Sequence, residues 1–237
     1  MTPWLEELDY RKTPLGELVL RRRRIAELDN AEVYEVRLGD EYLMSSLFHE
    51  AEVALADKGL GELGGGNWDV VVGGLGLGYT AAAALKFEQV KRLVIVEALE
   101  PVIEWHRKGL VPNGRTLTDD PRTVFHHADF FVLARGKGFD PDTADHRFDA
   151  VLLDIDHTPD LLLSSAHADF YTEAGLRRLD RFLKPGGVFG LWSNEAPDDG
   201  FLDILQRVFG RAEGHVIRFG NPLQQTTSAN GLYFART

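Results

Sequence analysis

The sequence predicts an α/β fold with a mostly parallel sheet, helices on both of its faces, and a small β-rich domain in front. Between residues 68 and 209, apolar runs that suit buried strands alternate with segments that favour helices, which is the pattern of βαβ units. Several of these runs lack polar alternation, as expected when both faces of a strand are covered. Residues 18–43 instead hold β-prone runs separated by turn dipeptides.

The length and composition are those of an ordinary globular protein. The chain has 237 residues, of which 44% are hydrophobic and 27% charged. This length allows one large domain or a main domain with a small appendage. We expect the second arrangement, with a β-rich domain at 1–45 and a Rossmann-like domain at 46–237.

The N-terminal part is predicted to be a small antiparallel unit followed by a helix. The runs LVLRRRRIAEL and EVYEVRLGDEYL are β-prone, and the dipeptides at 29–30 and 39–40 are typical of turns. From Ser45 the period changes, because SSLFHEAEVALADKGL opens with serines that can cap a helix and then spaces apolar residues on one face. This helix should end near Gly59.

The second part is predicted to alternate strands and helices. Its strands are the apolar runs WDVVVGG, RLVIVEA, TVFHHADFF, FDAVLLDID and VFGLWSN. Its helices are YTAAAALKF, LEPVIEWHRKGL, FLDILQRVF and the segment ADFYTEAGLRRLDRFLKPGG, which Pro185 and the following glycines stop. The runs HVIRFG and GLYFAR close the chain as a pair of strands, so the sheet should end in an antiparallel strand.

Composition excludes cysteine chemistry and membrane insertion. The chain has no cysteine, which rules out disulfides, thiolate metal sites, iron–sulfur clusters and thiol nucleophiles. Its aliphatic runs are far shorter than the ~20 residues that span a bilayer, and its start lacks the apolar core of a signal peptide. We expect a soluble protein of the reducing cytoplasm without a membrane partner.

The net charge disfavours nucleic acid as a partner. The chain carries 37 acidic and 26 basic side chains, a net charge of −11, which repels a phosphate backbone unless the bases cluster on one face. The four arginines at 21–24 form the one basic cluster. We interpret them as a solvated strand end, with a local anion patch as the alternative.

A glycine-rich loop follows the first strand of the second part and leads directly into a helix. Gly73, Gly74, Gly76 and Gly78 let the backbone turn tightly and approach a ligand near the helix N-terminus. The dinucleotide pattern G-x-G-x-x-G requires a small residue where this chain has Tyr79, which disfavours NAD. A P-loop is excluded because Gly-Lys-Ser/Thr is missing.

Acidic residues close the second and third strands. Glu97 ends RLVIVE, where a carboxylate can accept both ribose hydroxyls of a nucleoside. Asp129 follows TVFHHA, where it can face the adenine amino group or simply cap the next turn. A G-x-G-x-G loop followed by such an acid is the pattern of S-adenosylmethionine-dependent transferases. The sequence therefore predicts a site in which the four glycines, Glu97 and Asp129 bind S-adenosylmethionine or a related sulfonium.

Asp154 and Asp156 close the fourth strand and are the candidate catalytic residues. Ligands of open α/β sheets bind outside the carboxyl ends of the strands, and an Asp there can act as a base on an amine or hold a cationic substrate. Alternation sends both carboxylates to the same side if the strand continues past Asp154. No metal is expected, because adjacent His126 and His127 point apart and no helix carries H-x-x-x-H.

These motifs resemble the spermidine synthase (polyamine aminopropyltransferase) family of the S-adenosylmethionine methyltransferase superfamily, from about residue 39 to residue 192. VVVGGLGLGYTAAAAL is similar to its glycine loop and helix, and AHADFYTEAGLRRLDRFLKPGGV to its Phe-Tyr helix. Phe48-His49-Glu50 resembles its Tyr-His-Glu, which implies that His49 contacts the cofactor and Glu50 the substrate. FDAVLLDIDHTP falls where the family has D-x-x-D-P, which implies a substrate contact for His157. The resemblance also implies the methyltransferase fold and a homodimer formed through the N-terminal domain.

Three departures from the family pattern favour a different reaction. Gly76 stands where the family has the Asp that meets the amine of decarboxylated S-adenosylmethionine, His157 replaces the second Asp of D-x-x-D-P, and Phe48 replaces the tyrosine. An aliphatic ammonium has a pKa of about 10 and needs carboxylates to hold and deprotonate it. With Gly76 the loop also resembles an ordinary methyltransferase loop, which accepts a methionine carboxylate. We therefore expect methyl or related alkyl transfer to a small amine-bearing substrate. The alternatives are a true aminopropyltransferase that uses decarboxylated S-adenosylmethionine, and an inactive nucleoside-binding scaffold.

Overall fold

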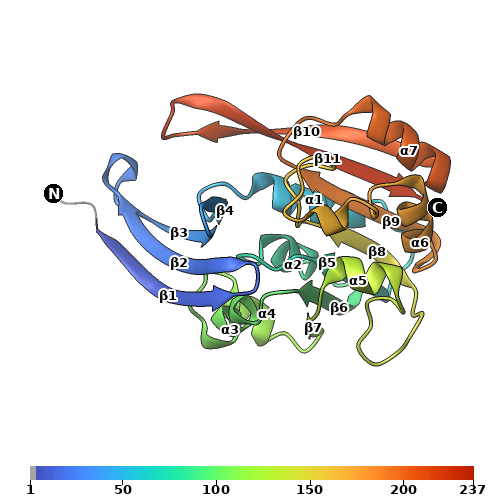
Figure 1. Ribbon diagram of the computed structural model, residues 1–237, viewed down its shortest axis with the longest axis horizontal. Coiled ribbons are helices and arrows are strands. Elements are labelled where there is room, and N and C mark those ends of the chain that lie inside the picture. Colours follow the sequence, from blue (N-terminus) through green and yellow to red (C-terminus); the bar gives the residue numbers. More distant parts are fainter. Residues whose placement is uncertain (1–3) are drawn as a thin grey trace.

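The computed structural model describes residues 4–237, which form a four-stranded and a seven-stranded sheet (Figure 1). The predicted fold class is confirmed, because the larger sheet is mostly parallel, helices cover it, and the strands that end the chain are antiparallel. The first sheet ends at residue 45. The division into domains at 1–45 and 46–237 stays a prediction, and residues 1–3 lie outside the described part.

The small sheet is built from neighbouring strands paired in chain order. They are β1 (Leu5–Thr13), β2 (Gly16–Ile25), β3 (Ala31–Leu38) and β4 (Glu41–Ser45), with η1 (Ala26–Leu28) before the turn into β3. The sequence did not predict β1. This strand lies at the edge of the sheet and reads LEELDYRKT, so its charged residues hide the alternation that normally marks a strand.

The four arginines at 21–24 lie in β2, and three of them lie near acids of the neighbouring strands. Arg22 contacts Glu6 of β1 at 2.7 Å, and Arg23 contacts Glu35 of β3 at 2.5 Å. These contacts favour the strand interpretation over a free anion patch, because the two guanidinium groups already have carboxylate partners.

The large sheet has the order β10-β11-β9-β8-β5-β6-β7. Its strands are β5 (Trp68–Gly73), β6 (Val90–Glu97), β7 (Thr123–His127), β8 (Phe148–Leu153), β9 (Leu183–Ser193), β10 (Arg211–Asn221) and β11 (Thr226–Arg236). β5 pairs in parallel with β6 on one side and β8 on the other. The chain changes direction across the sheet at this point, so the carboxyl ends of these three strands form the crevice in which ligands of such sheets bind.

Helices cover the large sheet. They are α1 (Glu50–Gly61), α2 (Tyr79–Ala84), α3 (Glu100–Lys108), α4 (Gly114–Thr118), α5 (Phe130–Arg135), α6 (Glu173–Asp180) and α7 (Asp199–Phe209), with η2 (Ser165–His167) before α6. Alternation along β5 sends Val70 and Val72 into the core shared with α1 to α4, and Val71 into the core shared with α5 to α7. Leu18 and Leu20 of β2 join the first core.

The helix predicted from Ser45 begins later, at Glu50. Ser45 and Ser46 do not cap it, because their hydroxyls accept hydrogen bonds from the backbone N–H groups of Leu47 (3.1 Å) and Tyr34 (2.9 Å). The two serines instead form the turn that leads out of β4. No helix in the described part of the chain is both long and apolar enough to cross a bilayer.

Candidate active site

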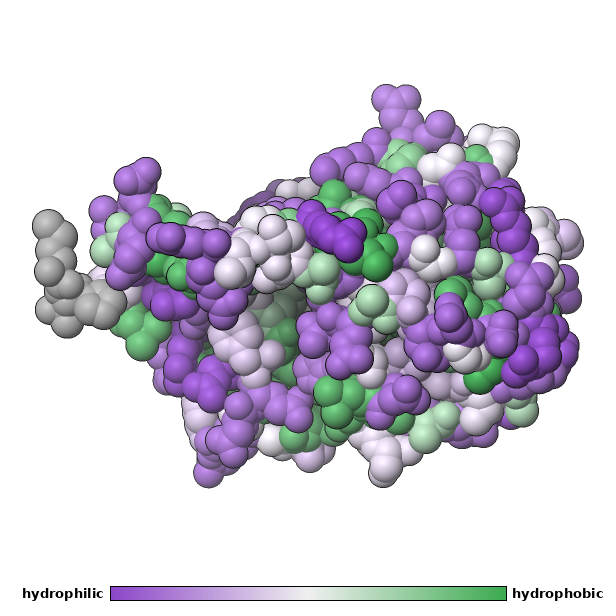
Figure 2. All heavy atoms as spheres, turned by 90° about the horizontal axis from the view of Figure 1, so that it is seen from above, coloured by the Kyte–Doolittle hydropathy of each residue, from purple (hydrophilic) through white to green (hydrophobic). Residues whose placement is uncertain are grey.

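A cavity of about 340 Å³ opens at the carboxyl ends of β5, β6 and β8. The small sheet forms one wall through residues of β3 and β4, and the glycine loop, the first turn of α1, and the loop after β8 form the others. Figure 2 shows the molecule hollowed between its narrow end, which carries the N-terminal strands, and its broader body. The cavity therefore lies where the topology predicts a ligand site.

The glycine loop reaches this cavity with Gly74 and Gly76, while Gly73 and Gly78 are not among the residues that line it. Gly74 has a φ of +92°, and a Cβ atom there would lie 2.1 Å from the Asp154 carbonyl oxygen, so only glycine fits. Gly73 and Gly78 are needed for packing instead, since a Cβ atom would meet the rings of Phe130 and His106, respectively.

Position 76 is closed by a side chain of the small sheet. A Cβ atom on Gly76 would lie 2.4 Å from the Met44 sulfur, and the same sulfur accepts a hydrogen bond from the Leu77 N–H at 3.0 Å. The loop is held from the other side by His106, whose Nε2 lies 3.0 Å from the Gly76 oxygen, and by the Asn113 amide, which donates to the Leu77 oxygen. Met44 therefore occupies the space that a side chain at position 76 would take.

Glu97 and Asp129 both line the cavity, as predicted. The Glu97 carboxylate accepts hydrogen bonds from the N–H groups of Leu99 (2.8 Å) and Leu75 (3.0 Å), while burial raises its pKa. Asp129 caps α5, since its Oδ1 accepts from the N–H groups of Phe131 and Val132 at 2.8 and 3.0 Å. Capping and ligand contact are compatible for Asp129, because the cap uses only one of its two oxygens.

Asp154 lies in the cavity directly after β8 and is paired with an acid that the sequence analysis missed, Glu52 of α1. The Thr80 hydroxyl donates to Asp154 Oδ2 at 3.0 Å. Burial raises the pKa of both carboxyl groups, and the Asp154 charge raises that of Glu52 further. Glu52 could have been identified from its spacing, because it lies on the same helix face as the buried residues Leu55 and Ala56.

Two of the residues implied by the Phe-His-Glu motif stay outside the cavity. Glu50 is exposed and its Oε2 accepts a hydrogen bond from the His49 N–H at 3.0 Å. His49 precedes α1 and stacks on Tyr79, with ring centroids 4.1 Å apart. Tyr79 itself lines the cavity, so His49 supports a wall of the site from behind. His157 does line the cavity, with its Nε2 3.4 Å from Glu41 at the rim.

Asp156 is not among the residues that line the cavity. β8 ends at Leu153, so the alternation that was to send Asp154 and Asp156 to the same side does not continue. The Asp156 carboxylate is 1% exposed and accepts hydrogen bonds from Leu163 N–H (2.8 Å), His167 Nδ1 (2.8 Å) and the Tyr171 hydroxyl (2.9 Å). Through these hydrogen bonds Asp156 stabilises the loop after β8, in which Leu163 and His167 form part of the cavity wall.

The cavity is strongly acidic. Its lining includes the carboxylates of Glu41, Glu52, Glu97, Asp129 and Asp154. Within residues 4–237 no lysine or arginine lines it, and the only basic side chains there are two imidazoles. Such a site attracts cations and repels a ligand carboxylate.

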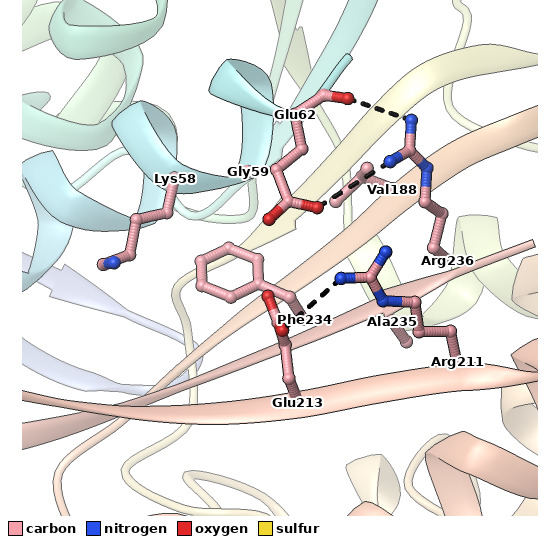
Figure 3. A pocket seen from close by; sticks show the side chains of 9 residues that line it. All are labelled: Lys58, Gly59, Glu62, Val188, Arg211, Glu213, Phe234, Ala235 and Arg236. Carbon is pink, nitrogen blue, oxygen red and sulfur yellow. Dashed lines mark hydrogen bonds and ion pairs between the residues drawn. The ribbon is translucent and has the colours of Figure 1, made fainter.

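A second hollow lies away from this site, between the end of α1 and strands β9 to β11 (Figure 3). It holds about 20 Å³, room for about one water molecule. Four of its five charged residues contact one another: Arg236 donates to the Glu62 carbonyl at 2.9 Å, and Arg211 lies 3.8 Å from the Glu213 carboxylate. This hollow is therefore no competing ligand site.

Known proteins with similar sequences are polyamine aminopropyltransferases. The protein from Nitrosomonas europaea is 34% identical over 122 residues, 52% of this chain and 34% of the relative. The protein from Pyrobaculum aerophilum is 30% identical over 125 residues, 51% of this chain and 39% of the relative. That from Prochlorococcus marinus is 28% identical over 149 residues, 61% of this chain and 48% of the relative. The chain thus spans about a third to a half of the length of these curated relatives, and no family model matches it.

Two solved structures with the same fold are spermidine synthases. The structure from Thermotoga maritima matches with a TM-score of 0.69 at 19% identity, over 97% of this chain and 72% of that one. A spermidine synthase in complex with the transition state analogue AdoDATO matches with a TM-score of 0.70 at 19% identity, over 97% and 73% of the two chains. The chain is similar in sequence to polyamine aminopropyltransferases and in fold to spermidine synthases. The resemblance predicted from the sequence motifs is thereby confirmed.

The expectation of methyl transfer for this spermidine synthase-like chain is wrong. Its relatives carry the name polyamine aminopropyltransferase, which agrees with the alternative reaction. The expectation depended on the idea that Gly76 lets the loop accept the carboxylate of S-adenosylmethionine. Met44 fills the space beside Gly76, and Glu52 and Asp154 keep the cavity acidic.

Proposed function

We propose that this protein transfers an aminopropyl group from decarboxylated S-adenosylmethionine to a small aliphatic amine. The observation that carries the proposal is the acidic cavity, in which carboxylates face the ligand space and no lysine or arginine of the described chain does. S-adenosylmethionine carries a carboxylate that such a site repels, whereas its decarboxylated form and the amine acceptor are purely cationic. The names of the relatives support the same reaction.

The residues present fit a sulfonium nucleoside. We assign Glu97, at the end of β6, to accept ribose hydroxyls, and Asp129 to contact the adenine with the oxygen that does not cap α5. Gly74 brings the backbone of its loop against the ligand space. In this arrangement the adenosine lies over β6 and the start of α5, and the reacting carbon lies toward Asp154.

The reaction is a displacement at a carbon attached to sulfur, and the sulfonium supplies the activated leaving group. The protein must deprotonate the attacking ammonium, align its nitrogen with the carbon–sulfur bond and exclude water. A carboxylate takes the proton, the nitrogen–carbon bond forms, and the carbon–sulfur bond breaks with its electrons passing to sulfur. We assign Asp154 to hold or deprotonate the ammonium, and Leu43, Val102 and Trp192 to exclude water from the cavity.

Calorimetric titration with S-adenosylmethionine and with its decarboxylated form tests the choice of co-substrate. We expect tighter binding of the decarboxylated form, and transfer to putrescine detected by mass spectrometry of the alkylated amine. Asp154→Asn should abolish turnover while leaving affinity for the nucleoside product, which lacks the aminopropyl ammonium, within about tenfold. Tighter binding of the carboxylated form, or a methylated product, would contradict the proposal.

Two further properties are proposals from the resemblance. We propose a homodimer formed through the small sheet and a cytoplasmic location. Size-exclusion chromatography with light scattering tests the first, because a monomer at micromolar concentration contradicts it. Cell fractionation tests the second.

A further inference from the structure

Glu52 is an acid buried at the wall of the cavity, with no cation and no side-chain donor beside its carboxylate among the described residues. It sits in the first turn of α1, its residue is 8% exposed, and it contributes to the cavity lining. No side chain within residues 4–237 donates a hydrogen bond to its carboxylate, whereas Glu97, Asp129 and Asp154 each have such donors or backbone N–H partners. A buried carboxylate whose only described hydrogen bond comes from its own backbone N–H is costly, and a cationic ligand would offset that cost.

The surroundings of Glu52 contain negative and neutral groups rather than cations. Asp154 faces it from the end of β8, Tyr79 from α2, and Glu50 lies on its own helix. The remaining titratable groups of the cavity are Glu41, Glu97, Asp129, His157 and His167. Glu52 and Asp154 line the same cavity, and the negative charge of Asp154 raises the pKa of Glu52, which favours one proton between the two carboxylates.

We propose that Glu52 and Asp154 form a proton-sharing acid pair that binds one aliphatic ammonium group and releases the shared proton when it does. The inference rests on the proposed function and adds Glu52 to it. Without ligand, one proton offsets the repulsion between the two carboxylates. When an ammonium enters, its positive charge replaces that proton, which leaves to solvent, so charge balances before and after. The ammonium can come from the acceptor amine or from the aminopropyl chain of decarboxylated S-adenosylmethionine.

The test is calorimetry near pH 7 in buffers of different ionisation enthalpy, which counts the protons released per ligand bound. Putrescine and decarboxylated S-adenosylmethionine are titrated separately into the full chain. The wild type should release close to one proton with at least one of them, and the ligand that causes release identifies the source of the ammonium. Glu52→Gln should abolish that release and weaken binding of the same ligand at least tenfold.

Glu50→Gln is the matched control, because it makes the same change two residues away on an exposed position of the same helix. It should keep wild-type affinity and proton release, and Asp154→Asn should lose the release as Glu52→Gln does. Wild-type proton release and affinity in Glu52→Gln would overturn the proposal.

A carboxyl NMR titration of the wild type separates failure of the pair from failure of the proposed function. If neither ligand binds, the proposed function is wrong, and the NMR titration of the ligand-free protein then tests whether Glu52 and Asp154 share a proton. A carboxyl signal that titrates well above the ordinary range and disappears in Glu52→Gln supports the pair. Titration of all carboxyl groups in the ordinary range would overturn it.

Discussion

His106 should make the stability of this protein fall steeply in mild acid. It lies on α3 with 0% exposure, its Nε2 is 3.0 Å from the Gly76 oxygen, and its Nδ1 has no partner within the described residues. Burial lowers the pKa of His106 to about 4, from an ordinary value of 6.5. The neutral ring fits this position because it can donate to Gly76, whereas the protonated ring would bury an unpaired N–H and a charge.

The sign follows from which state binds the proton. Between the folded and unfolded pKa values the unfolded chain carries the extra proton, so stability is fully present above the unfolded value and is lost as pH falls toward the folded one. Going from about pH 7.5 to about pH 5, this linkage removes about 2 kcal/mol from the free energy of unfolding. That is a large share of the 5–15 kcal/mol typical of a domain.

Urea unfolding of the wild type and His106→Gln at the two pH values measures the effect. Glutamine can still donate to Gly76 but does not titrate, so the wild type should lose about 2 kcal/mol more than the variant on acidification. Glu52, Glu97 and Asp154 have raised pKa values and act in the opposite direction, but they are common to both proteins and cancel in the difference. Equal losses in the two proteins would refute the reasoning.

The other predictions concern the cavity. Gly76→Ala should lower the free energy of unfolding by about 1–3 kcal/mol, since the new methyl group meets the Met44 sulfur at a φ of +47°, and adding Met44→Ala should recover part of it; thermal denaturation measures both. Glu97→Gln should weaken binding of decarboxylated S-adenosylmethionine at least tenfold in calorimetry, and unchanged affinity would remove Glu97 from the site. Glu52→Gln should stabilise the protein more at about pH 8 than at about pH 5. The raised pKa of Glu52 means that its ionised carboxylate destabilises the folded state increasingly as pH rises. Equal stabilisation at the two pH values in urea unfolding would contradict this prediction.

The parts of the fold that depend on local pattern were predictable from the sequence. The apolar runs of β5, β6 and β8, the glycine loop and Glu97 follow from strand periodicity and from the rule that ligands bind at the carboxyl ends of parallel strands. Asp154 was predictable for the same reason. These features are determined within a few residues of the chain.

The features that depend on contacts between distant segments were not predictable. Glu52 reaches the cavity only because α1 packs beside the end of β8, which the sequence does not reveal. The Phe-His-Glu motif pointed to Glu50 instead, and Glu50 is exposed. Asp156 turns away because β8 ends three residues earlier, a boundary that hydrophobic pattern does not resolve. Position 76 was misjudged because Met44 comes from another sheet.

The contact between Met44 and Gly76 has a consequence for how this protein can diverge from its relatives or be recombined with them. The Met44 side chain fits beside a loop that carries glycine at position 76, whereas a larger residue at position 76 requires that side chain to move or to be replaced by a smaller one. Substitutions at positions 44 and 76 should therefore be made together. A chimera that takes its first 45 residues from one parent and the remainder from another should be less stable when the residues at these two positions come from different parents.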